Sequence, residues 1–509
     1  MTITEDASVA SPKGYPLGHT RPPLDVEDLP EPEEVFKVPH IGPKQAITHV
    51  IGPSLIALGI SIGSGEWLLA PLGVASYGFV GIGWVILISA VLQTFYNMEI
   101  SRYIMATGEV PILGFARVAP GAIFWIAVSL AILYMANIWG GWAAGAGESL
   151  YVLFTGDLVD TPSERTTARF LAFGLMLLVL AITLVGRKIA RTLELVNWVI
   201  VGFIVVTLLI VDLIVVPFST WATALRGLVT PALPPSGVDA TVIGGIVGYT
   251  ALSSGLNWYA MNYYRDHGYG MGYRVGFIAG LIGGQQETIS PNGKTFPVTP
   301  ANERRWKRWF RLLMLDQWVV FFGGAVIGIF LTTLLVSHLA GMPGEAAPTR
   351  ETMPTYAADV LSRHYGSFFY YWALLMGFFV LFSTQIGIYE GLVRNVADGL
   401  YGTSERFRRF LAGDPRRFYY PYMAVLAVVI GIILFVALPV GLVLISANMA
   451  NLGALIYPFL LMYLNSKLPG PARMGWWSYV ILVLNVLFFG FFFINFAVSE
   501  LTGNALVSF

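Results

Sequence analysis

The 509-residue sequence contains no cysteine and few charged residues. The absence of cysteine excludes disulfide bonds, thiolate metal ligands and cysteine catalysis. Only 12% of the residues are charged, against roughly 25% in a soluble domain, and 30 basic residues balance 30 acidic ones. A chain without net positive charge has no electrostatic basis for binding nucleic acid. No constellation of catalytic residues is visible, so we expect neither an enzyme nor a bound cofactor.

Histidine is also scarce, and its positions argue against a metal cluster in the membrane. The six histidines lie in tails, in loops or at the ends of apolar runs. The sequence therefore offers no histidine site at the centre of a bilayer. These histidines are at positions 19, 40, 49, 267, 338 and 364.

Long apolar runs make up most of the chain, and 56% of its residues are hydrophobic. About 20 apolar residues in a helix cross the hydrocarbon core of a bilayer, which is about 30 Å thick. The sequence therefore predicts an all-α, multi-pass membrane protein. Hydropathy places eleven spans, at residues 47–76, 81–107, 119–155, 166–187, 192–217, 239–262, 312–338, 368–400, 419–439, 442–464 and 476–500.

The basic residues fall mainly on one side of these spans. If the N-terminus is cytoplasmic, every Lys and Arg lies in loops or at helix ends on that side except Arg165, Arg169, Arg226, Arg350 and Arg363. Basic residues accumulate in cytoplasmic loops of membrane proteins. We therefore expect a cell-membrane protein with the N-terminus inside and the C-terminus outside.

The first span contains an expected break. The apolar run 46–77 is interrupted by Gly63-Ser64-Gly65-Glu66. Backbone freed from a helix is tolerated at membrane depth only where protein or a water-filled cavity covers it. An ionisable group at the bilayer centre costs at least about 3 kcal/mol and usually marks function. Glu66 therefore favours a functional break over a simple glycine packing contact.

The sixth span contains a second cluster of small and polar residues. Residues 244–257 place four glycines, Thr250, Ser253, Ser254 and Asn257 within an apolar run. Breaks in the first and sixth helices are typical of two inverted five-helix repeats. We expect one repeat at 46–217 and the second at 239–464. The remaining expected parts are a polar, disordered cytoplasmic tail at 1–45, a region 218–311 that holds helix 6 (239–262) and a cytoplasmic loop (263–311), and helix 11 with the C-terminus at 465–509.

Five segments match the motifs of one known family in order and spacing. They are Gly52-Pro53 running to Gly65 and Trp67, Asn97-Met-Glu-Ile-Ser-Arg102 with Thr107-Gly108, Gly186-Arg187-Lys188 with Leu193-Glu194, Leu225-Arg226-Gly227 with Pro231, Pro234 and Pro235, and Asp316. Over most of residues 46–464 the chain thus resembles the Nramp family of divalent-metal transporters. The resemblance implies a LeuT-like fold and secondary transport by alternating access.

The departures from the family fall on the residues that would bind the metal. Nramp proteins carry Asp-Pro-Gly-Asn in the first break, where this chain has Gly63-Ser64-Gly65-Glu66, and Met-Pro-His in the sixth helix, where it has Leu252-Ser253-Ser254. The glutamine of the tenth helix aligns with Ala447, and two acids of the third helix align with Trp139 and Trp142. The family's thioether selects softer transition metals. We therefore expect the scaffold to be shared and the substrate not to be Mn²⁺ or Fe²⁺.

An oxygen-lined cation site around Glu66 is the first hypothesis for the substrate. Glu66 is the only candidate metal ligand with a charge, and Ser64, Thr250, Ser253 and Ser254 can add hydroxyl oxygens. Such ligands suit Mg²⁺, Ca²⁺, Na⁺ or a proton. Glu66 can equally carry the proton in coupled symport. Its third possible role is structural, as a hydrogen-bonded acid that braces the break.

A small organic amine or amino acid is the alternative substrate. Gly63-Ser64-Gly65 resembles the Gly-Ser-Gly of amino-acid transporters with the same fold, where backbone amides hold a carboxylate. Trp139, Trp142 and Tyr249 can line a pocket for an apolar or cationic molecule through their ring faces.

Two further possibilities stay open. Glu148 is the other acid of the third span, and it is either a relocated proton relay or an acid at the outer interface. A chain that lost its ligands but kept its packing would be a non-transporting sensor. No ATP-binding motif is visible, so we expect an ion gradient to drive any uphill transport. The sequence specifies no oligomeric state.

Overall fold

The structure is a computed structural model that describes residues 29, 53–184, 189–276, 290, 292–436, 438–503 and 505–507, without the side chains of residues 189–192. The predicted tail, apart from Leu29, lies outside the described residues, as do Gly186-Arg187-Lys188 and most of the loop 277–291. The described part of the chain is helical and contains no strand. The predicted all-α class is therefore confirmed.

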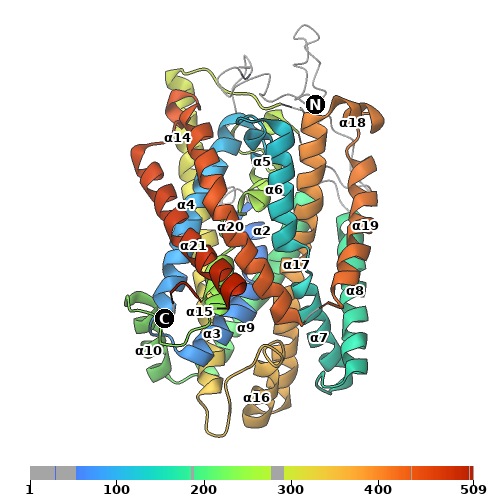
Figure 1. Cartoon of the computed structure of the whole chain (residues 1–509), viewed down its shortest axis with the longest axis vertical. Coiled ribbons are helices and arrows are strands. Elements are labelled where there is room, and N and C mark those ends of the chain that lie inside the picture. Colours follow the sequence, from blue (N-terminus) through green and yellow to red (C-terminus); the bar gives the residue numbers. More distant parts are fainter. Residues whose placement is uncertain are drawn as a thin grey trace.

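Nine segments are long and apolar enough to cross a membrane, counted over the described residues (Figure 1). Two further spans complete the predicted eleven: α4 (Gly83–Thr107), and the pair α11 (Ala240–Tyr249) and α12 (Trp258–Met261) on either side of the second break. The nine are α2 (Pro53–Ser61) with η2 (Gly65–Leu69) and α3 (Ala70–Tyr77), α6 (Ala122–Asn137) with α7 (Gly141–Thr155), α8 (Pro162–Leu184), α9 (Ile189–Val215), α14 (Pro300–Leu315) with η4 (Asp316–Phe322) and α15 (Gly323–Ala340), α17 (Ser367–Thr403), α19 (Arg416–Ile433), α20 (Pro439–Ser466) and α21 (Trp476–Thr502).

Short helices lie towards the two ends of the bundle. The helices α5 (Pro111–Phe115) and α18 (Glu405–Phe410) lie at the end where α14 begins, and α10 (Phe218–Val229) and α16 (Tyr356–Tyr365) lie towards the opposite end (Figure 1). The helix α13 (Tyr263–Asp266) follows α12 after the second break. The spans thus run between two sets of short connecting helices.

The third span differs from the prediction, which treated 119–155 as one helix. It is divided at Gly140, whose φ of 67° is left-handed and ends the α6 geometry. The two glycines there allow close packing: a Cβ on Gly140 would lie 2.6 Å from Ile430 of α19, and one on Gly141 would lie 2.8 Å from the Pro439 carbonyl of α20. The Gly-Gly pair therefore interrupts the helix and allows the third span to pack closely against α19 and α20.

Five buried charged side chains join the segment after the second break to α17. Arg265 donates its two terminal guanidinium nitrogens to Asp398, both at 3.1 Å, and its Nε to Asp266 at 3.0 Å. Arg394 also pairs with Asp266 and donates its Nε to Glu390 at 2.7 Å. All five are buried. Because each charge has an opposite partner, the cluster fixes α13 against α17 without leaving an isolated ion in the interior.

We predict that Arg394→Gln destabilises the fold by about 3–5 kcal/mol, because it leaves the buried carboxylate of Glu390 without its cation and leaves Asp266 with Arg265 alone. The matched control is Arg409→Gln, which breaks the exposed pair with Glu405 and should cost no more than about 1 kcal/mol. Thermal unfolding of both variants in detergent measures the difference. Equal melting temperatures would show that the buried cluster contributes little.

Candidate functional site

The first break is short. The helix α2 ends at Ser61, Ile62 and Gly63 form a turn, and η2 continues as a π-helix. The Ile62 amide still donates to the Leu58 carbonyl and the Trp67 amide to the Gly63 carbonyl, both at 2.7 Å. The predicted break is therefore present, but it frees few backbone groups. A π-helical turn of this kind often lies at a functional site.

The second break is longer, because residues 250–257 between α11 and α12 are not helical. Ala251 and Ser254 have φ angles of 69° and 40°, in the left-handed region that side chains other than glycine rarely adopt. Such backbone persists only where surrounding contacts hold it. The break thus needs support from neighbouring helices.

Gln93 of α4 supplies much of this support. Its Nε2 donates to the Thr250 carbonyl, and its Oε1 accepts from the Ser254 amide and from Asn257 Nδ2, both at 3.2 Å. The side chain is fully buried. One amide side chain therefore satisfies both a donor and an acceptor that the break leaves free.

Sequence reasoning missed this row of polar residues, although α4 carried a signal for it. Ser89, Gln93 and Asn97 are four residues apart and so lie on one helix face. Ser89 Oγ donates to the Val247 carbonyl at 2.9 Å, and Asn97 Oδ1 accepts from Asn257 at 2.7 Å. Polar residues repeated at helical spacing in an apolar span indicate a buried polar partner.

Glu66 connects the two breaks. Its Oε2 accepts from the Gly63 amide at 3.1 Å, and its Oε1 accepts from the Ala251 amide at 3.3 Å and from Ser61 Oγ at 3.5 Å. The side chain is fully buried. This geometry corresponds to the bracing role among those considered from the sequence.

The two breaks are also in direct backbone contact at Gly65. A Cβ on Gly65 would lie 2.0 Å from the Tyr249 carbonyl oxygen. Only glycine allows this approach, since no Cβ fits at such a distance. The residue type at position 65 thus sets how closely the first helix meets the sixth.

A small cavity of about 10 Å³ lies between the breaks and α17, with room for about one water molecule. The side-chain oxygens that line it belong to residues of both breaks and to Thr384 of α17. The Thr384 Oγ1 donates a hydrogen bond to the Ile60 carbonyl at 3.0 Å. Thr384 was not predicted, although Ser383-Thr384-Gln385 is a polar run in an apolar helix. The lining residues are Ile60, Ser61, Ser64, Gly65, Trp142, Tyr249, Leu252, Ser253, Thr384 and Ile388.

An aromatic pair forms one wall of this cavity. Trp142 Nε1 donates to Ser64 Oγ at 2.6 Å, and the Trp142 and Tyr249 rings lie 5.7 Å apart. Tyr249 in turn donates its hydroxyl to the Ala136 carbonyl at 3.1 Å. The third span is thereby fastened to both breaks through aromatic side chains.

The structure brings six of the thirteen predicted site residues to the cavity. Ser64, Gly65, Trp142, Tyr249, Leu252 and Ser253 line it. The others in the breaks, Gly63, Glu66, Thr250 and Ser254, are buried beside it but are not among its lining residues. The Ser254 hydroxyl has no hydrogen-bond partner among the described residues.

Three predicted residues lie away from the cavity. Trp139 is partly exposed and lies in the turn after α6, where it donates to the Met135 carbonyl. The division of the third span at Gly140 separates it from the face that carries Trp142. Ala447 packs its carbonyl against Gly248 of α11. Glu148 is 9% exposed and interacts electrostatically with Arg165 and Arg169 of α8.

No group of three or more His, Cys, Asp or Glu side chains that could hold a metal lies together among the described residues. The cavity itself presents hydroxyl groups and ring faces. Any ion held there would be ligated by neutral oxygens.

The comparisons with known proteins concern the fold. No family model and no curated protein matches the sequence. Solved structures of a manganese transporter from Eremococcus coleocola are similar to this chain. One, in complex with an aromatic bis-isothiourea substituted compound, has 14% identity and a TM-score of 0.59, and the match covers 93% of this chain and 92% of that one. A glutamate-to-alanine mutant has 13% identity and a TM-score of 0.62, with 95% and 93% covered.

These similarities show that the chain has the fold of that transporter. The predicted LeuT-like membrane fold, with breaks in its first and sixth helices, is therefore confirmed. Similarity at 13–14% identity establishes the fold alone.

We predict that Gly65→Ala disrupts the contact between the breaks, because its Cβ would overlap the Tyr249 carbonyl. Overpacking of this kind typically costs about 1–3 kcal/mol. The control is Gly174→Ala in α8, where a Cβ meets nothing within 4 Å. Melting temperatures should fall for Gly65→Ala and stay unchanged or rise for Gly174→Ala; the reverse order would refute the close approach.

We also expect Gln93→Leu to destabilise the second break by about 1–3 kcal/mol, since the Thr250 carbonyl and the Ser254 amide lose their partner in a buried place. Gln93→Glu is the informative companion, because a carboxyl keeps the acceptor and loses the donor when ionised. Hydrogen exchange of residues 250–257 should rise in both variants. Unchanged exchange would show that other contacts hold the break.

Proposed function

We propose that the chain is a secondary membrane transporter that works by alternating access and binds its substrate in the cavity between the two breaks. The observation that carries the proposal is that cavity: it lies where the first, sixth and eighth spans meet and is lined from both breaks. Transporters with interrupted helices place their substrate at such a midplane position. The fold shared with a manganese transporter supports the same class of function.

A small hard cation is the substrate that the site supports best. The cavity oxygens belong to Ser61, Ser64, Ser253 and Thr384, and oxygen ligands suit hard cations such as Na⁺, Mg²⁺ and Ca²⁺. In the described part of the chain, no thioether or imidazole, the ligands that favour softer transition metals, lines the cavity. Ser61 also donates to Glu66 at 3.5 Å, so the carboxyl group stands directly behind the lining. Glu66 would then favour a cation electrostatically while holding the two breaks together. A single carboxyl favours a monovalent ion over a divalent one.

A small organic amine is the second candidate, and one observation favours it. The rings of Trp142 and Tyr249 form a wall of the cavity, and aromatic faces attract organic cations. The cavity volume of about 10 Å³ opposes this candidate, because an amine needs the helices to separate first. The amine is therefore ranked below the inorganic ion.

We also propose how the chain is oriented in the membrane and how it divides into two repeats. The distribution of Lys and Arg supports a cytoplasmic N-terminus and an external C-terminus. Residues 46–217 and 239–464 would form the two inverted repeats, with residues 465–509 added as an eleventh helix. Accessibility labelling of single cysteines is straightforward in a chain that has none of its own.

The test is titration calorimetry of the purified protein with Na⁺, Mg²⁺, Ca²⁺ and Mn²⁺. We expect binding heat for at least one hard cation and none for Mn²⁺. Ser64→Ala and Ser253→Ala should each lower the affinity for that cation at least tenfold, because each removes a lining oxygen. Ser219→Ala on the exposed helix α10 is the control. Uptake of the bound ion into proteoliposomes would then establish transport.

Three other outcomes would change the conclusion. Heat for Mn²⁺ that disappears in Glu66→Gln would mean that a transition-metal site is retained. Binding heat for amines and none for the four ions would favour the organic substrate. No binding heat for either ions or amines would favour a non-transporting protein.

Glu66→Gln also separates bracing from binding. A glutamine can accept from one of the two amides but presents a donor to the other, so one buried N–H loses its partner. We expect the ion-free variant to be less stable by about 1–3 kcal/mol. A melting temperature equal to that of the unaltered protein, together with lost cation binding, would assign Glu66 to binding alone.

A further inference from the structure

The outer face of α14 is strongly basic. Five cations follow one another over two turns, and the acid of this helix, Glu303, pairs with Lys307 at 2.7 Å. The side chains of Trp306 and Trp309 turn inwards and are 3% exposed. The exposed cations, here called the basic face, are Arg304, Arg305, Lys307, Arg308 and Arg311.

The length of this helical segment places the basic face at the membrane boundary. From Pro300 to Ala340 the segment has 41 residues, which at 1.5 Å per residue is roughly 60 Å. The hydrocarbon core is about 30 Å thick, so the first turns extend beyond it. Directly after Arg311 the exposed side chains become apolar: Met314 is 37% exposed and Leu315 50%. The hydrocarbon therefore begins within about one turn of Arg311.

A pair of tryptophans marks the same level on α21, which packs against α4 as α14 does. Trp476 and Trp477 open α21, are 64% and 62% exposed, and stack with their ring centroids 3.8 Å apart. Exposed tryptophan is enriched at the level of the lipid headgroups. Arg102 of α4 lies between the two elements, 4.5 Å from the Phe310 ring and donating to the Ala472 carbonyl at 3.2 Å.

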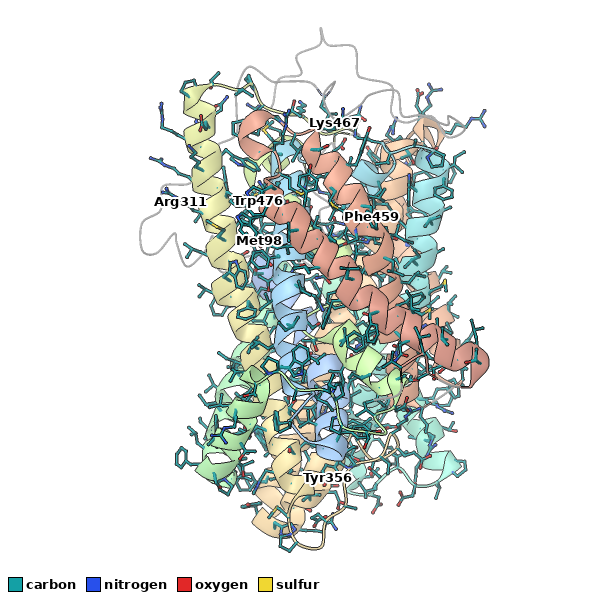
Figure 2. All side chains as sticks on the ribbon, turned by 60° about the vertical axis from the view of Figure 1, so that its left-hand side comes forward. Met98, Arg311, Tyr356, Phe459, Lys467 and Trp476 are labelled. Carbon is teal, nitrogen blue, oxygen red and sulfur yellow. The ribbon has the colours of Figure 1, made fainter. Side chains whose placement is uncertain are left out.

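The basic face and the tryptophans thus belong to one surface. Figure 2 shows Arg311 and Trp476 at a similar height, with Met98 of α4 just below Trp476. Arg473, in the turn before α21, is exposed and adds another cation. Guanidinium groups bind phosphate through paired hydrogen bonds, and indole rings lie well among lipid headgroups.

We propose that this surface binds the headgroup of an anionic phospholipid at the end of the bundle where α14 begins. The basic face holds the phosphate, Trp476 and Trp477 cover the glycerol region, and the acyl chains lie along the apolar surface that starts at Met314 and Leu315. A lipid fits better than a soluble anion because the cations and the apolar surface are continuous on one helix.

The experiment is competitive binding of phosphatidylglycerol and phosphatidylcholine to the purified full-length protein, read by native mass spectrometry. We expect phosphatidylglycerol to be retained preferentially. The double variant Arg308→Gln, Arg311→Gln should lose this preference by about fivefold for each arginine. The double variant Arg406→Gln, Arg409→Gln removes two exposed arginines from α18 at the same end of the bundle and should keep it (Figure 1).

Three results would overturn the proposal. The first is no preference for phosphatidylglycerol in the unaltered protein. The second is an equal loss in both double variants, which would mean general charge attraction instead of a site. The third is displacement of the lipid by millimolar inorganic phosphate, which would mean a site for free anions. Melting temperatures of both double variants must equal that of the unaltered protein. The double variant Arg308→Lys, Arg311→Lys should keep part of the preference.

Discussion

The rest of the site depends on the hydrogen bonds that the Glu66 carboxyl group accepts from the two breaks. This group accepts hydrogen bonds from the amides of Gly63 and Ala251, which belong to the two breaks, and so satisfies donors that have no helical partner. Inside a membrane such donors cannot turn to water, and each unpaired one costs several kcal/mol. The carboxyl group has two acceptor oxygens, and each of them accepts from one break. The position of the cavity follows from that connection.

The fold could be predicted from the sequence because its main determinants are local. Apolar runs of sufficient length give the spans, and glycine, serine and acid within them give the breaks at Gly63–Glu66 and in residues 244–257. The division of the third span at Gly140 was missed because a Gly-Gly pair in an apolar run is compatible with a continuous membrane helix. Only the neighbours α19 and α20 decide that the helix bends there.

The site could be predicted only in part, since its composition depends on contacts between residues far apart in the chain. Ser64, Gly65 and Ser253 follow directly from the breaks. Gln93 and Thr384 come from other helices, and no local pattern states which break they face. The bracing contacts of Glu66 could not be predicted for the same reason. A buried acid in the sequence suggests a ligand or a proton carrier, and only the structure shows that its oxygens accept from the Gly63 and Ala251 amides. Trp142 lines the cavity and Trp139 does not, because the chain turns at Gly140, which lies between them.

The buried charges beside the second break have a mechanical consequence. Arg265 and Asp266 of α13 are paired with Asp398 and Arg394 of α17, and Tyr419 of α19 donates to Glu390 in the same cluster. Separating these groups would expose several unpaired ions to a medium of low polarity. The half-helix after the second break is therefore coupled to the eighth and ninth spans as a single rigid body. Any motion that opens the cavity towards that end has to carry all three together, with its hinge in the non-helical residues 250–257.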